Sequence, residues 1–364
     1  MTAAQNGSMV ITGLGMRCAV GQNVIHCCAA VRAGISRFLE WPYMKDPTGE
    51  EETNLVAAAI VPDLGNCSWV EKFQDLLTQP LLESLWAADL ANIGDAQNAP
   101  RWGIFLSIPP LDRPGIEIED AEEFLEEIRD KPPIPCQPAS IAMISKGHAG
   151  ALLTLEQAMR ALRENTLDIC VVCGIDSLLE TEFLSSLMDE GKLKTEANPA
   201  GLIPGEAGAC IVLEMEEHAR MRKVESLARL TPVRIGLETA PVFGEDPGRA
   251  DVMAKILTEA ISDIPCGAAG IYRIINDLNG ERWRFLEWAM AEARSLTTVY
   301  PYRRLWHPAD CFGDIGAASG AAHICIAVRA FQRSYAAGEA ILVSSSSDSG
   351  ERAATIVLPA LHKS

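Results

Sequence analysis

The chain has 364 residues, of which 48% are apolar and 22% charged, and its formal net charge is −18. Such a composition is typical of a soluble globular protein, and the acidic excess makes nucleic acid a poor partner, because binding it requires basic residues. No apolar run reaches the roughly 18 residues of a membrane span, and residues 1–8 lack the regions of a secretory signal. We therefore expect a cytoplasmic protein without a membrane span.

The 11 cysteines lie mostly within apolar runs. Because free cysteine packs as a small apolar residue, we predict buried thiols in a reducing compartment. Cys170 and Cys173 have the spacing of a metal or redox pair, but in a strand residues three apart point to opposite faces of the sheet. We predict no metal ion and no cofactor.

Strands and helices alternate along the first half of the chain. Residues 40–53 are polar and predict a loop, and 119–129 predict an acidic surface helix. The best-patterned helix is His148–Arg163, whose apolar residues form one stripe. The other predicted elements are a strand at 9–14, a helix at Val24–Ala33, a strand at 55–61, helices over 69–91, and strands at Trp102–Ile108 and 168–174.

The second half repeats this order of elements without a close sequence repeat. A long helix is expected at 315–335, rich in small residues near its start. The remaining predictions are strands at 233–237 and Ile271–Asn276, helices at 250–261 and 281–294, and paired strands at 340–345 and 353–358.

A motif in the middle of the chain suggests a family. Residues 202–214 read Leu-Ile-Pro-Gly-Glu-Ala-Gly-Ala-Cys-Ile-Val-Leu-Glu, which predicts a tight turn at 204–208 followed by a buried strand. This stretch resembles the "PGEGAG…VLE" signature of the β-ketoacyl synthases, which belong to the thiolase superfamily. Residues 10–36, with their Gly-x-Gly turn and following helix, resemble the opening of these enzymes.

The resemblance implies an α/β thiolase-like fold of two duplicated halves in five layers, α-β-α-β-α. The expected halves are residues 1–225 and 226–364. Helices His148–Arg163 and 315–335 are expected to be buried at the centre, where their small and apolar residues allow close packing.

The catalytic residues that the resemblance implies are absent at the matching positions. In these synthases a cysteine precedes the central helix, whose N-terminus lowers the pKa of the thiol. Gly147 occupies that position here, so no nucleophile is expected. The next residue, His148, is a weak candidate for a substitute base, and Lys146 for an anion contact beside the helix N-terminus.

The two family histidines match Asn276 and Gly313. Asparagine can donate a hydrogen bond but cannot carry protons at neutral pH. Asp277 and Glu281 could form a carboxylate pair, although Glu281 also suits the start of a helix. A displaced pair of His307 and Cys311 is a further alternative. The glycine-rich loop of the family corresponds to 344–352, which here is rich in serine.

Two functions remain open from the sequence. The first is a noncatalytic protein that pairs with itself as a homodimer or with a catalytic synthase paralogue as a heterodimer, or serves as an adaptor or scaffold for another protein. Apolar residues at Trp102–Ile108 or 141–144 are candidates for the sheet edge that would pair. The alternative is an acyltransferase or 3-oxoacyl synthase-type enzyme of fatty acid or polyketide metabolism with altered active-site residues. An acidic carrier protein could bind this acidic chain only at a local basic patch on its surface, where the charges attract.

Overall fold

One large mixed sheet runs through the molecule. The computed structural model describes residues 7–46, 55–64, 68–90, 100–130, 138–239, 248–265 and 267–361. From one edge to the other, the strands are β11 (Arg304–Trp306), β10 (Ile271–Asn276), β12 (Ala340–Ser346), β13 (Glu351–Pro359), β8 (Ala228–Leu230), β1 (Met9–Cys18), β7 (Glu206–Met215), β6 (Ile169–Ser177), β4 (Trp102–Ile108) and β5 (Ser140–Ser145), and β9 (Arg234–Leu237) pairs with β13. The strands of the two halves meet at β8, which pairs with both β1 and β13.

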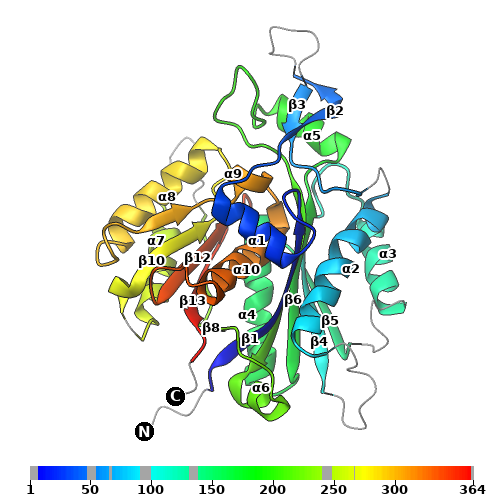
Figure 1. Cartoon of the computed structure of the whole chain (residues 1–364). Coiled ribbons are helices and arrows are strands. Elements are labelled where there is room, and N and C mark those ends of the chain that lie inside the picture. The colour runs from blue at the N-terminus through cyan, green and yellow to red at the C-terminus, as the bar shows by residue number, and fades with distance from the viewer. Residues whose placement is uncertain are drawn as a thin grey trace.

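Helices cover the outer face of each half of the sheet. α2 (Trp69–Ala87) and α3 (Ile118–Asp130) share an apolar cluster with β4, β6 and β7. α7 (Asp251–Ser262) and α8 (Arg282–Ser295) share another with β10, β12 and β13. Figure 1 shows these two pairs of helices on opposite sides of the molecule.

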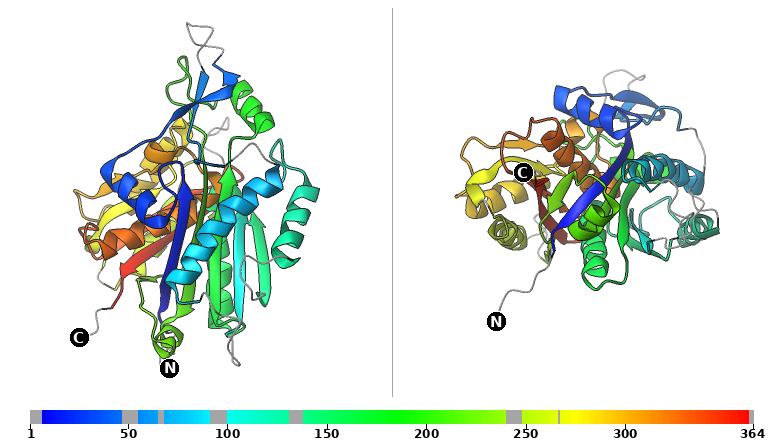
Figure 2. Two further views of the ribbon diagram at one scale, coloured as in Figure 1. Left: turned by 45° about the vertical axis from the view of Figure 1, so that its right-hand side comes forward. Right: turned by 60° about the horizontal axis from the view of Figure 1, so that its bottom comes forward.

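Two further helices fill the space between the halves. α4 (Gly150–Arg163) and α10 (Ser319–Gln332) belong to a third apolar cluster, to which strands of both halves contribute. Every residue of α10 from Ser319 to Val328 is buried, because its small side chains allow close packing on all sides. The molecule thus has five layers, α-β-α-β-α, with the predicted helices at the centre (Figures 1 and 2).

Each central helix begins later than predicted, because a short 3₁₀ turn precedes it. These turns are η1 (Gly147–Ala149) before α4 and η3 (Gly316–Ala318) before α10. α10 also ends at Gln332, three residues before the predicted end at Tyr335.

The prediction of a loop over 40–53 is wrong for its first part. β2 (Leu39–Lys45) is a strand because it pairs with β3 (Leu55–Ala58), although its residues are mostly exposed. Residues 47–54 lie outside the described ranges. β2, β3 and α5 (Thr181–Asp189) stand at one end of the molecule, opposite α6 (Glu216–Arg222) (Figures 1 and 2).

The turn predicted at 204–208 is shorter than expected, since β7 already begins at Glu206. Gly208 serves helix packing instead: a Cβ there would lie 1.8 Å from the carbonyl oxygen of Leu76. The backbone of α2 therefore lies directly on this strand.

The cysteines that the structure describes are free and buried. Cys170 lies in the central cluster and Cys173 in the outer cluster beneath α2, so the two thiols face opposite sides of β6 as predicted. Within the described ranges, no group of histidine, cysteine and acidic side chains is arranged to hold a metal ion. None of the described helices is both long and apolar enough to cross a membrane.

Candidate active site: a buried ionic network

The turn into α4 bends through Gly147, which carries no side chain. Gly147 has a φ of 57°, in the left-handed region. A Cβ there would find its nearest neighbour, Pro110 Cγ, at 3.6 Å, which is ordinary contact. The hydroxyl of Ser347 accepts a hydrogen bond from the N–H of Ala149 (2.9 Å) and donates one to the carbonyl of Lys146. Ser347, from the turn between β12 and β13, thus holds the turn in place.

His148 faces a carboxylate from the second half of the chain. Its Nε2 lies 2.7 Å from Oδ1 of Asp314. The same carboxylate accepts hydrogen bonds from the N–H of Gly316 (2.9 Å) and from Nδ2 of Asn279 (2.6 Å). Asp314 is therefore fixed by three donors and joins the entrances of α4 and α10.

A buried arginine lies at the centre of the site. The guanidinium of Arg284, on α8, lies 3.2 Å from Asp277, 3.0 Å from Glu281 and 2.7 Å from Asp348, measured to the carboxylate oxygens. Its Nη2 also lies 3.2 Å from Nδ1 of His148. The Arg284 side chain is only 2% exposed, and a buried cation requires such partners to offset its lost hydration.

The network extends to a second buried ion pair. Arg352 Nε lies 2.8 Å from Oε1 of Glu287. Ser346 links the two pairs, because its hydroxyl donates to Glu287 (2.9 Å) and its N–H donates to Asp277 (2.7 Å). The last serine of β12 thus provides hydrogen bonds to this network.

These contacts shift the pKa values of the buried groups. Burial lowers the pKa of Arg284, but the carboxylates, Asp348 foremost, outweigh it and raise the pKa further above its ordinary value. Burial raises the pKa of Asp314, but His148 and Arg284 outweigh it and hold that pKa well below its ordinary value. Both groups are therefore charged at neutral pH.

The pKa of His148 reflects opposing influences. Burial and the positive charge of Arg284 lower it, while the carboxylate of Asp314 raises it, and the pKa lies above the ordinary 6.5. A guanidinium can only donate hydrogen bonds, so its contact with Nδ1 belongs to the neutral ring, with the proton on Nε2. Protonation of His148 strengthens the attraction to Asp314 and breaks the contact with Arg284.

The other motif positions contribute little to this network. Asn276 ends β10 and is buried; its Oδ1 accepts a 3.4 Å bond from the N–H of Leu278, and its Nδ2 has no partner among the described residues. Gly313 has no room for a histidine, since a Cβ there would lie 2.7 Å from the carbonyl oxygen of Ile203. The next side chain, that of Asp314, enters the site instead.

Little space remains between these groups. Asp277, Asn279, Asp314 and the buried His323 of α10 are among the residues that line a cavity of about 10 Å³, which is roughly the room of one water molecule. Burial above all, and His148 when it is protonated, lower the pKa of His323 to about 3, so the His323 ring is neutral. These groups are packed against one another, and a cavity of about 740 Å³ opens beside Glu281 and Asp348 at the rim of the network.

The remaining candidates have other partners. Lys146 pairs with Glu351 (2.8 Å), so its charge is already balanced. His307 pairs with Asp310 (2.7 Å), and no hydrogen bond joins it to the buried Cys311 among the described contacts.

Sequence reasoning missed Arg284, Asp314 and Asn279 as parts of the site. The sequence held one signal for Arg284 and one for Asp314. Arg284 follows Glu281 by three residues at the start of a predicted helix, and side chains three residues apart on a helix lie close together. Asp314 is the only acidic residue in the glycine-rich and alanine-rich segment 313–320.

Comparison with known proteins identifies the fold. No family model matches the chain, and no curated protein matches it in sequence. Among solved structures it resembles an oxazolomycin ketosynthase domain of Streptomyces albus, with a TM-score of 0.78, 13% identity, and 99% of this chain and 75% of that chain covered.

Two further structures are similar. One is a type II polyketide synthase ketosynthase solved in complex with its acyl-carrier protein and bound to the hexaketide, with a TM-score of 0.79, 17% identity, and 98% of this chain and all of that chain covered. The other is the ketosynthase from module 6 of the bacillaene synthase of Bacillus subtilis, with a TM-score of 0.76 and 14% identity. That match covers 98% of this chain and 72% of the ketosynthase. The chain therefore has the thiolase-like fold of the ketosynthases.

Proposed function

We propose that this protein is a ketosynthase-like subunit without condensing activity that acts as a partner or adaptor for another protein. The observation that carries the proposal is Gly147. The turn keeps the left-handed conformation and the space for a side chain, yet glycine provides no atom that could hold an acyl group. Without a nucleophilic side chain at this turn, no covalent acyl intermediate can form there.

The contacts around His148 support the same proposal. A general base needs a free nitrogen within hydrogen-bond reach of the proton that it removes. Both nitrogens of His148 are engaged, Nε2 with Asp314 and Nδ1 with Arg284. The ring is thereby suited to joining two halves of the fold rather than to accepting a proton from a substrate.

A partner role also fits the edge of the sheet. β5 ends the strand order, and its only neighbour among the described strands is β4. The edge carries Ile141, Met143 and Ile144, all half-buried, and an unpaired apolar edge favours pairing with a second chain. β4, the other candidate from the sequence, lies inside the sheet. We propose pairing through β5, in a homodimer or with a catalytic paralogue.

The proposal is tested by incubating the purified protein with a panel of acyl-CoA thioesters and measuring its intact mass. We expect no stoichiometric acyl adduct and no turnover in the wild type. Labelling of one cysteine by a cerulenin-type epoxide would contradict the proposal. Light scattering tests the pairing: a mass near 39 kDa, unchanged by any synthase from the same cell, would argue against it.

The alternative is an acyl-transferring or hydrolytic enzyme with altered residues. The observation in its favour is the 2.7 Å contact of His148 with Asp314, since a carboxylate commonly orients a catalytic histidine. This alternative requires turnover that His148→Gln abolishes while the fold is kept. A wild type without turnover on the thioester panel would rule against it.

A further inference from the structure

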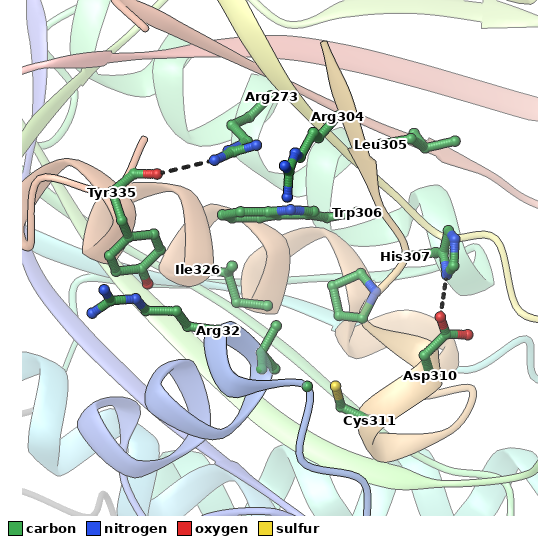
Figure 3. A pocket seen from close by; sticks show the side chains of 13 residues that line it. Arg32, Arg273, Arg304, Leu305, Trp306, His307, Asp310, Cys311, Ile326 and Tyr335 are labelled. Atoms are coloured by element: carbon green, nitrogen blue, oxygen red, sulfur yellow. Dashed lines mark hydrogen bonds and ion pairs between the residues drawn. The ribbon is translucent and has the colours of Figure 1, made fainter. Parts of the chain in front are cut away.

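A second cavity, remote from the ionic network, concentrates positive charge. It has a volume of about 490 Å³ and lies between the end of α1 (Val24–Ala33), the edge strand β11 and α10. Cavities of this size commonly hold small molecules. Figure 3 shows that Arg32, Arg273 and Arg304 all reach its walls, although the whole chain is strongly acidic.

None of these three arginines has an ion-pair partner in the part of the chain that the structure describes. Arg273 and Arg304 face each other in register on the neighbouring parallel strands β10 and β11. Like charges at such positions repel and destabilise the pairing. Burial, and then the charge of Arg304, lower the pKa of Arg273, and its Nε is buried without a hydrogen-bond partner. The one carboxylate that lines the cavity, Asp310, pairs with His307.

Aromatic rings hold two of the arginines in position. The guanidinium of Arg273 lies 4.8 Å from the centre of the Trp306 ring, and that of Arg32 lies 4.6 Å from the centre of the Tyr335 ring. The Nη2 of Arg273 also donates a long bond, 3.5 Å, to the carbonyl of Tyr335. Stacking of this kind reduces the freedom of a side chain, so less entropy is lost when it binds an anion.

The rest of the cavity is apolar. Figure 3 shows the Trp306 ring and Ile326 between Cys311 and the pair formed by Arg273 and Arg304. Val31, Leu305 and Pro308 also line the cavity. The charged groups therefore lie beside a surface that favours an apolar or planar group.

We propose that this cavity binds a small organic phosphate, with the phosphate held by Arg273 and Arg304 and the organic body against Trp306 and Ile326. Guanidinium groups match the oxygens of a phosphate in planar, bidentate geometry. A dianion placed between Arg273 and Arg304 would also remove the repulsion between them. This site is separate from the ketosynthase-like site, and the proposal stands whether or not the protein catalyses a reaction.

The test uses isothermal titration calorimetry on the full chain with three probes: phenyl phosphate, inorganic phosphate and phenol. We expect phenyl phosphate to bind more tightly than inorganic phosphate, and phenol not to bind. Binding should weaken at high salt, because part of the attraction is electrostatic. Equal binding of phenol, or absence of binding by both phosphates at millimolar concentration, would overturn the proposal.

Two variants and a matched control locate the site. Arg273→Gln and Arg304→Gln should each weaken phenyl phosphate binding by about tenfold or more, since each removes a charge-assisted contact. Arg160→Gln removes an exposed arginine of α4 and should leave binding unchanged. In the absence of phosphate, Arg304→Gln should raise the Tm, because it relieves the repulsion of Arg273. Unchanged affinity in both cavity variants would place any binding elsewhere and refute the site.

Discussion

The chain enters its two central helices through turns of the same shape in different surroundings. Each turn has a glycine with positive φ, 57° at Gly147 and 46° at Gly316, followed by a 14-residue helix. A Cβ at Gly147 would have ordinary contacts, whereas one at Gly316 would lie 2.1 Å from Oδ2 of Asp176. Glycine is thus favoured by conformation alone in the first turn and by packing as well in the second. The first turn keeps room for a side chain that the sequence does not provide.

The largest expected effect comes from breaking the network that joins the two turns. Arg284→Met leaves Asp277 and Glu281 buried without their cation, and we expect a loss of about 3–5 kcal/mol in the free energy of unfolding. Urea denaturation measures it. Arg282→Met, on the exposed side of the same helix, is the control and should cost at most about 0.5 kcal/mol. Equal effects of the two changes would mean that the ionic contacts contribute little.

The second expected effect tests the crowded turn. Gly316→Ala combines backbone strain with a clash against Asp176, and we expect a loss of about 2–5 kcal/mol. Asp176 cannot easily move away, because it accepts a bond from the N–H of Ala317 (2.8 Å) and pairs with Arg113 (2.8 Å). Thermal unfolding followed by circular dichroism measures the loss.

The open turn should respond more weakly to the same substitution. Gly147→Ala adds a methyl group where there is room, so only the left-handed conformation opposes it, at about 1–2 kcal/mol. The comparison uses the same unfolding assay as for Gly316→Ala. A loss at Gly147 as large as that at Gly316 would contradict the difference between the two turns.

The smallest expected effect is a pH dependence at His148. Burial and Arg284 lower the pKa of His148, but Asp314 outweighs them, so the pKa lies above 6.5 in the folded protein. The stabilisation that the charged ring provides is therefore complete below pH 6.5 and is lost as the pH rises through the folded-state pKa. The difference in unfolding free energy between wild type and His148→Gln should therefore be larger at about pH 5 than at about pH 9. A difference that grows with pH would show that the ring is held neutral.

Much of the fold could be predicted because it depends on local pattern. The bounds of α1, β4 and β10 match the predictions. Gly34 ends α1, and short apolar runs mark the two strands, so each signal lies within a few residues of its element. β2 and β8 were missed because each is a strand only through its pairing with distant segments. No local pattern encodes such pairing.

The candidate site could be predicted only in part, for the same reason. Motif spacing pointed to Gly147, His148 and Asn276, which occupy fixed positions along the chain. The network depends on contacts between residues far apart: His148 and Asp314 are separated by 166 positions and Arg284 and Asp348 by 64. The sequence contains these charged residues, but only the folded chain shows that they balance one another.

The three-residue strand β8 has a consequence for how the protein unfolds. It lies opposite Met9–Ile11 on one side and Val357–Pro359 on the other, so the hydrogen-bond ladders of the two halves are continuous. A fragment ending near residue 225 would lack this strand and expose the backbone of β1 to other molecules. The halves are therefore expected to unfold as one cooperative unit rather than to persist as separable domains.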